Sequence, residues 1–283
     1  MLLRHVLAAA DDSEEGRAAI MAAAHLGQRS GARVSVVTVV PAMPTEGVAA
    51  RLLERLSDTV ESQLRHLAQP RPNVDLAIEF GLPGIEIARF AETSGADLVI
   101  LGRKRRTSMQ RLLMGDTADA VARRSRVPCL FVQAGDHEYG RLLVALDGTE
   151  RGLGVLPVAM DFARDAHSRL RAVTVEPVYD NERDAPWVPT SRSERLAEAI
   201  DSLRNRSGAG SETWDTILGR SGEALVVHRG RVVDEILREV RASATDVLIL
   251  GCHRGGPAGM IEAGSITRRL MHECPSSVLT VPL

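Results

Sequence analysis

Short apolar runs alternate with longer amphipathic stretches along the whole chain. Runs such as 32–40 (ARVSVVTVV) and 96–102 (ADLVILG) have the length and the Val and Ile content of buried strands. Apolar residues recur at helical spacing in six stretches: 17–28, 48–67, 85–93, 153–166, 194–203 and 232–240. Strands that alternate with helices predict βαβ units, and therefore a parallel sheet with right-handed crossovers.

The same landmarks occur twice in the same order. The matching segments are 3–11 with 141–147, 32–40 with 170–175, 96–102 with 245–251, and 127–132 with 277–281. Such self-similarity predicts a duplicated domain, and the polar, glycine-bounded stretch 135–140 is the natural join. We expect domains at 1–135 (copy one) and 136–283 (copy two), with an insertion of 13 residues in copy two near 205–224, where Gly and Ser cluster.

The repeat also indicates where a ligand would bind. In open parallel sheets, ligands sit beyond the carboxyl ends of the strands, at the point where the strand order reverses. Asp11 and Asp147 end the first strand of each copy, and Gly102 and Gly251 end the fourth. We therefore expect a site near these residues in one or both copies.

The segment from Gly251 to Thr267 is the candidate phosphate-binding loop of copy two. It is rich in glycine, which lets backbone N–H groups approach phosphate oxygens without a side chain between them. Gly264 and Ser265 would open the next helix, whose first amides complete an anion pocket. Ser265 and Thr267 could equally be helix-capping residues.

These segments resemble the universal stress protein family, whose ATP-binding members carry Gly-x2-Gly-x9-Gly-Ser/Thr after the fourth strand. The resemblance covers nearly the whole chain. It implies an α/β fold of two tandem copies of a doubly wound, five-stranded parallel sheet domain of the adenine nucleotide α-hydrolase-like type, paired through their last strands.

The resemblance also implies roles for residues of copy two. Asp147 and Val175 would hold adenine and ribose, and the phosphates would be held by Gly251, Gly264, Ser265, Ile266 and Thr267. Arg254 stands where the family has its second glycine. Its side chain would either clasp a phosphate or fill the space that a phosphate needs.

Copy one departs further from the family pattern. Gly102 and Gly115 keep the 13-residue separation, but Arg105 replaces the second glycine and Asp116 stands where Ser or Thr is expected. A carboxylate there would repel a phosphate, although Asp116 is a sound helix cap. We expect no nucleotide site in copy one.

Composition excludes several classes of function. A net charge of −2 argues against general nucleic-acid binding. The apolar N-terminal residues are too few for a membrane span and fit a first strand better. The three cysteines, without CxxC spacing, fit a reducing compartment, so we expect a cytoplasmic protein with neither nucleic-acid nor membrane partners.

Three groups of side chains have both a functional and a structural interpretation. The basic run 103–106 could bind an anion, but a solvated loop is the expected role. Asp147 could be an acid or base, or a turn residue before Gly148. Cys252 with His253, and His272 with Cys274, lack the paired spacing of zinc ligands, so we expect no metal site.

The predicted function is a stress-response protein that binds ATP, with or without Mg²⁺, as a regulatory ligand of copy two. Neither a Walker sequence nor a nucleophile elbow is present, so we expect no enzyme, and any ATP hydrolysis would be slow. The alternative is an interaction scaffold in which both sites have lapsed. The two domains would pair within one chain, and a homodimer of such chains stays open.

Overall fold

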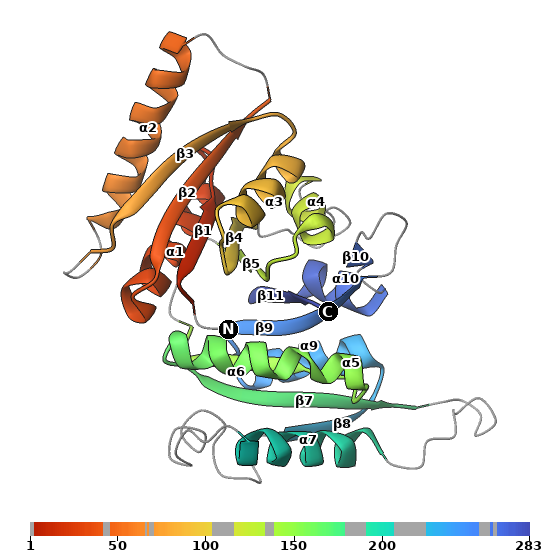
Figure 1. Ribbon diagram of the computed structural model, residues 1–283. Coiled ribbons are helices and arrows are strands. Elements are labelled where there is room, and N and C mark those ends of the chain that lie inside the picture. The colour runs from red at the N-terminus through yellow and green to blue at the C-terminus, as the bar shows by residue number, and fades with distance from the viewer. Residues whose placement is uncertain are drawn as a thin grey trace.

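The computed structural model describes residues 3–41, 46–65, 67, 71–103, 116–133, 139–178, 191–206, 225–254, 261–262 and 265–283. One continuous sheet runs through the molecule, with helices on both of its faces (Figure 1). Copy one lies in the upper half of Figure 1 and copy two in the lower half.

Copy one contains five strands and four helices in its described residues. They are β1 (His5–Ala9), α1 (Glu14–Ser30), β2 (Arg33–Val40), α2 (Glu46–Leu64), β3 (Val74–Phe80), α3 (Pro83–Thr93), β4 (Leu98–Gly102), α4 (Asp116–Arg124) and β5 (Cys129–Val132).

Copy two repeats this order with additions. Its elements are β6 (Arg141–Ala145), α5 (Glu150–Leu153), α6 (Val155–Asp165), β7 (Arg169–Pro177), α7 (Arg192–Arg206), β8 (Leu225–Gly230), α9 (Val232–Ala242), β9 (Val247–Arg254), β10 (Ile261–Glu262), α10 (Ser265–Glu273) and β11 (Ser277–Pro282). The helix expected over 153–166 is α6, and a short helix, α5, precedes it with Gly154 between them. Pro157 near the start of α6 has no N–H to continue the hydrogen bonds of α5.

The two copies have the same topology. The strand order is β3-β2-β1-β4-β5 in copy one and β8-β7-β6-β9-β11 in copy two, and the strands within each copy pair in parallel. The last strands, β5 and β11, pair antiparallel with Phe131 beside Val278 and Cys129 beside Thr280. The predicted fold class and the pairing through the last strands are therefore confirmed.

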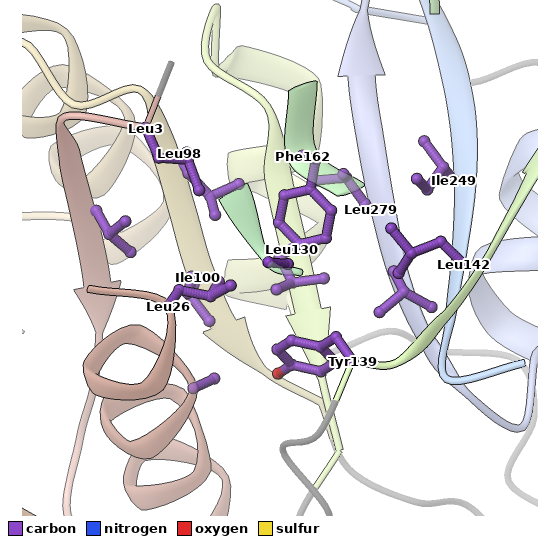
Figure 2. Close-up of a cluster of buried hydrophobic side chains, with 14 of the residues drawn as sticks. Leu3, Leu26, Leu98, Ile100, Leu130, Tyr139, Leu142, Phe162, Ile249 and Leu279 are labelled. Carbon is purple, nitrogen blue, oxygen red and sulfur yellow. The ribbon is translucent and has the colours of Figure 1, made fainter. Parts of the chain in front are cut away.

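The sheet separates two apolar cores that each extend across both copies. Helices α1, α2, α6 and α7 pack on one face, and α3, α4, α9 and α10 pack on the other. Figure 2 shows the first core, where Leu26 and Ile100 of copy one share a cluster with Phe162 and Ile249 of copy two. Since each buried aliphatic side chain stabilises the fold by about 1.5–3 kcal/mol, these shared cores hold the copies together.

An aspartate before the fourth strand fixes the start of the first strand in each copy. Asp97 Oδ2 accepts hydrogen bonds from the backbone N–H groups of Arg4 and His5, both at 2.9 Å. Asp246 Oδ2 accepts one from the N–H of Arg141 at 2.8 Å. The repeated Asp in ADLVILG and TDVLILG is thus a structural residue.

Two polar contacts join the copies on the face of α1 and α6. The backbone N–H of Leu3 donates to Asp165 Oδ2 at 2.7 Å, and Arg29 Nη1 donates to the carbonyl of Ala166 at 2.9 Å. Together with the β5–β11 ladder they fix copy one against copy two.

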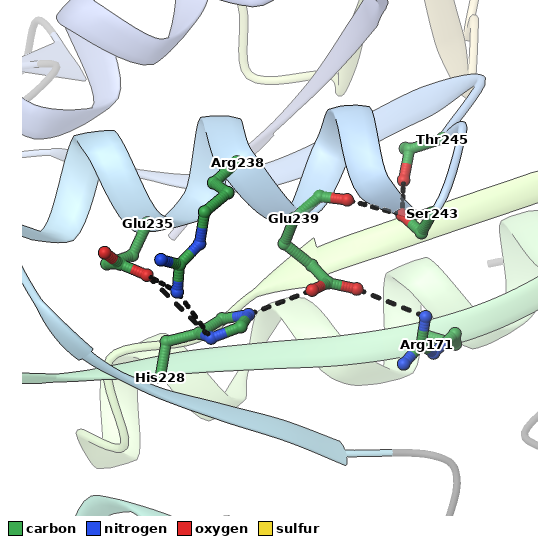
Figure 3. A network of polar contacts seen from close by, with 7 residues as sticks. All are labelled: Arg171, His228, Glu235, Arg238, Glu239, Ser243 and Thr245. Carbon is green, nitrogen blue, oxygen red and sulfur yellow. Dashed lines mark hydrogen bonds and ion pairs between the residues drawn. The ribbon is translucent and has the colours of Figure 1, made fainter.

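A network of charged side chains fastens α9 to the outer strands of copy two (Figure 3). The carboxylate of Glu239 receives His228 Nε2 at 2.9 Å and Arg171 Nη1 at 3.2 Å, and Arg238 pairs with Glu235. Charged side chains on an edge strand such as β8 also discourage pairing with another chain.

The domain boundaries at 135 and 136 stay a prediction, and most of the predicted insertion at 205–224 lies outside the described residues. No helix in the described ranges has the length and apolar character needed to cross a membrane.

Candidate functional site

The carboxyl ends of three adjacent strands of copy two lie at one edge of the sheet. β6 is flanked by β9 on one side and β7 on the other, so the strand order reverses at β6. Asp147 follows β6, Val175 is a buried residue of β7, and Gly251 lies in β9. Three of the predicted site residues are therefore on neighbouring strands, at the switch point where ligands of such folds bind.

The Asp147 carboxylate is held in a tight turn that begins α5. Its Oδ1 atom accepts hydrogen bonds from Thr149, from the backbone N–H at 2.9 Å and from the hydroxyl at 2.7 Å. The Thr149 hydroxyl in turn accepts the N–H of Gly152 at 3.0 Å, as an N-cap residue does. The expected turn role of Asp147 is thus observed, and this turn fixes the carboxylate just beyond the end of β6.

Copy one has the same turn. Asp11 Oδ1 accepts the N–H of Ser13 at 3.1 Å and also its hydroxyl, and the Ser13 hydroxyl accepts the N–H of Gly16 at 3.0 Å. The shared pattern is Asp-x-Ser/Thr-x-x-Gly, and its hydroxyl and glycine were not among the predicted site residues. Their signal was present in the sequence, since the same spacing occurs in both copies.

The glycine of this turn has to lack a side chain. A Cβ atom on Gly152 would lie 2.0 Å from Asp147 Oδ1, and one on Gly16 would lie 2.2 Å from the Asp11 carbonyl oxygen. Either contact is far inside van der Waals distance. The glycine therefore lets the aspartate approach the helix that follows.

The predicted phosphate loop begins later than expected. Residues 252–254 continue β9 beyond Gly251, because β10 pairs with them antiparallel, placing Arg254 beside Ile261 and His253 beside Glu262. Gly264 and the side chains of Arg254 and Ser265 lie outside what the structure describes.

The start of α10 lies against the end of β9. The helix begins at Ser265, and the Thr267 hydroxyl donates to the Gly251 carbonyl oxygen at 3.2 Å. Thr267 therefore ties the helix to the strand instead of capping it. Ile266, the residue between them, is 44% exposed. The first amides of α10 are thus held next to Gly251, as a phosphate site would require.

The prediction of a solvated loop is wrong for Arg103, the first residue of the basic run. Its side chain is buried between the two copies, and its guanidinium donates to backbone carbonyls at the end of α10. Residues 104–106 lie outside the described ranges. Burial also lowers the pKa of the Arg103 guanidinium from its usual value.

A cavity of about 530 Å³ lies between the strand ends of copy one and the helices α9 and α10 of copy two, not beside the predicted loop of copy two. Its walls include Asp11, Val39 and Gly102 at the strand ends of copy one, together with Leu237 and residues 271–275 of copy two. Asp116, at the start of α4, precedes the lining residue Thr117. Residues 255–260 and 263–264 of the predicted loop of copy two lie outside the described ranges, so cavity volume does not decide between the copies.

The three cysteines are buried thiols. Burial raises the pKa of Cys129 and of Cys252 to about 12, and it also raises that of Cys274. Such thiols are neutral and unreactive at neutral pH. Within the described part of the chain, His, Cys, Asp and Glu side chains form no metal-binding group of three or more.

The fold defines a tandem pair of doubly wound α/β domains that share one sheet. The sequence matches the universal stress protein family twice, over residues 3–133 and 138–282. The chain therefore belongs to this family, as its motifs indicated.

Individual proteins that are similar in sequence or in structure support this family and this fold. Universal stress protein MJ0531 of Methanocaldococcus jannaschii is 26% identical over 141 residues, which are 47% of this chain and 83% of the relative. The crystal structure of a universal stress protein from Archaeoglobus fulgidus has a TM-score of 0.69 at 16% identity, with 98% of each chain covered. A Pseudomonas aeruginosa protein described as functionally unknown, PA1789, has a TM-score of 0.64 at 16% identity, covering 99% of this chain and 92% of its own. Both structures share the fold over the whole length of this chain.

Proposed function

We propose that copy two binds ATP as a regulatory ligand, with the base and ribose near Asp147 and Val175 and the phosphates near Gly251 and the start of α10. The observation that carries the proposal is the hydrogen bond between Thr267 and Gly251, which holds the first turn of a helix against the end of a central strand. The N-terminus of a helix presents unpaired N–H groups and a partial positive charge, both of which favour a phosphate.

The difference between the copies supports the choice of copy two. Ser265 begins α10, whereas Asp116 begins α4 at the corresponding place. A carboxylate at this position would oppose the phosphate charges, and a serine hydroxyl would not. Ile266 and Thr267 would then lie in the first turn that faces the phosphates, with Gly264 and Arg254 on the preceding segment.

Equilibrium binding of ATP, measured by calorimetry with and without Mg²⁺, tests the proposal. Asp147→Ala should weaken binding about tenfold or more, while the matched variant Asp11→Ala in copy one should leave it unchanged. Comparing ATP with cAMP, which lacks the β- and γ-phosphates, separates recognition of the base from recognition of the phosphates. If Asp11→Ala were the variant that weakened binding, the ligand would belong to copy one.

A reciprocal exchange tests the phosphate end of the site. Ser265→Asp gives copy two the residue of copy one and should abolish ATP binding, and the fold should tolerate it because Asp116 already begins a helix at the corresponding place. Asp116→Ser is the matched control and should leave the affinity of copy two unaltered. Equal ATP affinity in Ser265→Asp and wild type would contradict the assignment of the phosphates to α10.

The alternative function is an interaction scaffold that binds no nucleotide. It predicts no saturable binding at millimolar ATP and no nucleotide carried through purification. In either case we place the protein in a reducing cytoplasm, since its cysteines are free thiols. Light scattering in solution would show whether two chains associate further.

A further inference from the structure

Arg103 reaches from copy one to the end of a helix of copy two. Its side chain is only 8% exposed, and its backbone N–H donates to the carbonyl of Val132 at 2.7 Å, which fixes it to the β4–β5 pair. Its guanidinium donates to the carbonyl oxygens of Met271, of Cys274 at 2.9 Å and of Ser276 at 2.6 Å. One side chain of copy one therefore binds three carbonyls of copy two.

These carbonyls belong to the last turn of α10 and the residues that follow it. The last carbonyls of a helix have no partner within the helix and carry a partial negative charge, so a buried cation is favourable there. Gln133, which follows β5, adds weaker contacts from its Nε2 atom to the carbonyls of Cys274 at 3.4 Å and Ser276 at 3.5 Å. Copy one thus supplies the polar partners for the carboxyl end of α10.

The amino end of the same helix is fixed by copy two itself, through the Thr267 hydroxyl and the Gly251 carbonyl. A helix of this length spans roughly 13 Å, so both of its ends are held over a short distance. The end held by copy one lies opposite the end at which the proposed phosphate site forms.

This arrangement is not reciprocal. The residue after Gly251 that corresponds to Arg103 after Gly102 is Cys252, a buried thiol without a charge. The position of copy two that matches Arg103 therefore supplies no cation to the carboxyl end of α4. The cation supports the helix that begins with Ser265 and not the one that begins with Asp116.

We propose that Arg103 is a positioning residue for the nucleotide site of copy two: by fixing the carboxyl end of α10 from copy one, it holds the amino end of that helix in the place where phosphates bind. The ligand part of this inference rests on the proposed function. Removal of the guanidinium takes its donor from the carbonyl of Met271 and leaves those of Cys274 and Ser276 with only the weaker contacts from Gln133, so α10 loosens and its first amides are less well placed. ATP affinity should then fall about tenfold, although the contacts of Arg103 are at the opposite end of α10 from the proposed phosphate site.

The test compares Arg103→Met with Arg29→Met. Methionine keeps the length of the arginine stem but donates no hydrogen bond, and Arg29 makes a cross-copy hydrogen bond elsewhere, to the carbonyl of Ala166 just after α6. Hydrogen–deuterium exchange of the amides of residues 265–273 is measured without ligand, and ATP affinity is measured separately. In Arg103→Met, exchange in α10 should accelerate and ATP affinity should drop, whereas Arg29→Met should change neither.

The two measurements separate the two proposals. Absence of ATP binding in the wild type would refute the proposed function, while exchange in α10 would still test Arg103. Unchanged exchange in Arg103→Met would refute the positioning role, and so would unchanged ATP affinity in a wild type that binds ATP. If Arg103→Met does not fold by circular dichroism, Arg103→Lys takes its place. Lysine keeps the charge but lacks the planar fork, so exchange in α10 should accelerate less, and unaltered exchange would again refute the role.

Discussion

Replacing Gly152 by alanine should displace the carboxylate of Asp147. The added Cβ atom would lie 2.0 Å from Asp147 Oδ1, and a carboxylate on a side chain can rotate away from it. In the corresponding turn of copy one, a Cβ atom on Gly16 would lie 2.2 Å from the carbonyl oxygen and 2.7 Å from the nitrogen of Asp11, which are backbone atoms. The same substitution should therefore act through a side chain in copy two and through the backbone in copy one.

The structure sets the size of these effects. Rotation of the Asp147 carboxylate breaks its hydrogen bonds to the N–H and hydroxyl of Thr149, each worth about 1 kcal/mol at an exposed site. Alanine in place of glycine stabilises a helix by about 1 kcal/mol, which offsets part of this loss. Gly152→Ala should therefore destabilise the protein by about 1 kcal/mol. Gly16→Ala, which has to move the backbone, should cost about 2–3 kcal/mol.

Urea unfolding followed by circular dichroism measures these changes in the free energy of unfolding. Each glycine is replaced once in the wild type and once in a variant in which the aspartate of the same turn is already alanine. When Asp147 is already alanine, Gly152→Ala has no carboxylate to displace and should stabilise the protein by about 1 kcal/mol. When Asp11 is already alanine, Gly16→Ala should still destabilise it, because the backbone contact remains. An equal effect of Gly152→Ala in both backgrounds would refute this account of the turn. Gly152→Ala should also lower ATP affinity to the level of Asp147→Ala.

Two further predictions concern groups that burial perturbs. The pKa values of about 12 for Cys129 and Cys252 predict that a thiol reagent at pH 8 labels neither in the folded protein. Denaturant should expose all three cysteines to labelling. Rapid labelling of Cys129 or Cys252 in the folded protein would contradict this prediction. Burial, with a smaller contribution from Arg33, lowers the pKa of His5 below 6.5, so the folded state favours its neutral form. The stability that this provides is complete above pH 6.5 and is lost as the pH falls through the folded pKa; urea unfolding between pH 5 and 8 should show this slope, and His5→Gln should reduce it.

Much of the fold could be predicted from sequence, because central parallel strands are buried on both faces and appear as unbroken apolar runs. The edge strands β3 and β8 were not located individually, because they lack such an unbroken run. Each has an edge open to solvent and carries charged or polar side chains, such as Glu79 and His228, that interrupt the apolar run. Their presence followed only from the family resemblance.

The candidate site was predictable in part. Asp147 and Gly251 end apolar runs, so the place of Asp147 after β6 followed from the sequence alone, whereas β9 continues three residues beyond Gly251. The turn through Thr149 and Gly152 has a sequence signal, but its meaning depends on a hydrogen-bond relay that only coordinates display. The burial of Arg103 had no local signal, because its partners are about 170 residues away and belong to the other copy.

Because both domains belong to one polypeptide and pair through the β5–β11 ladder, they form the equivalent of a heterodimer with a fixed one-to-one stoichiometry. In a symmetric homodimer every substitution is present in both subunits, so the loss of a ligand-binding loop in one is its loss in both. Here each half can mutate alone, and Asp116 can stand in one half while Ser265 is kept in the other. The two halves of the chain can therefore acquire different functions, and dilution cannot separate them.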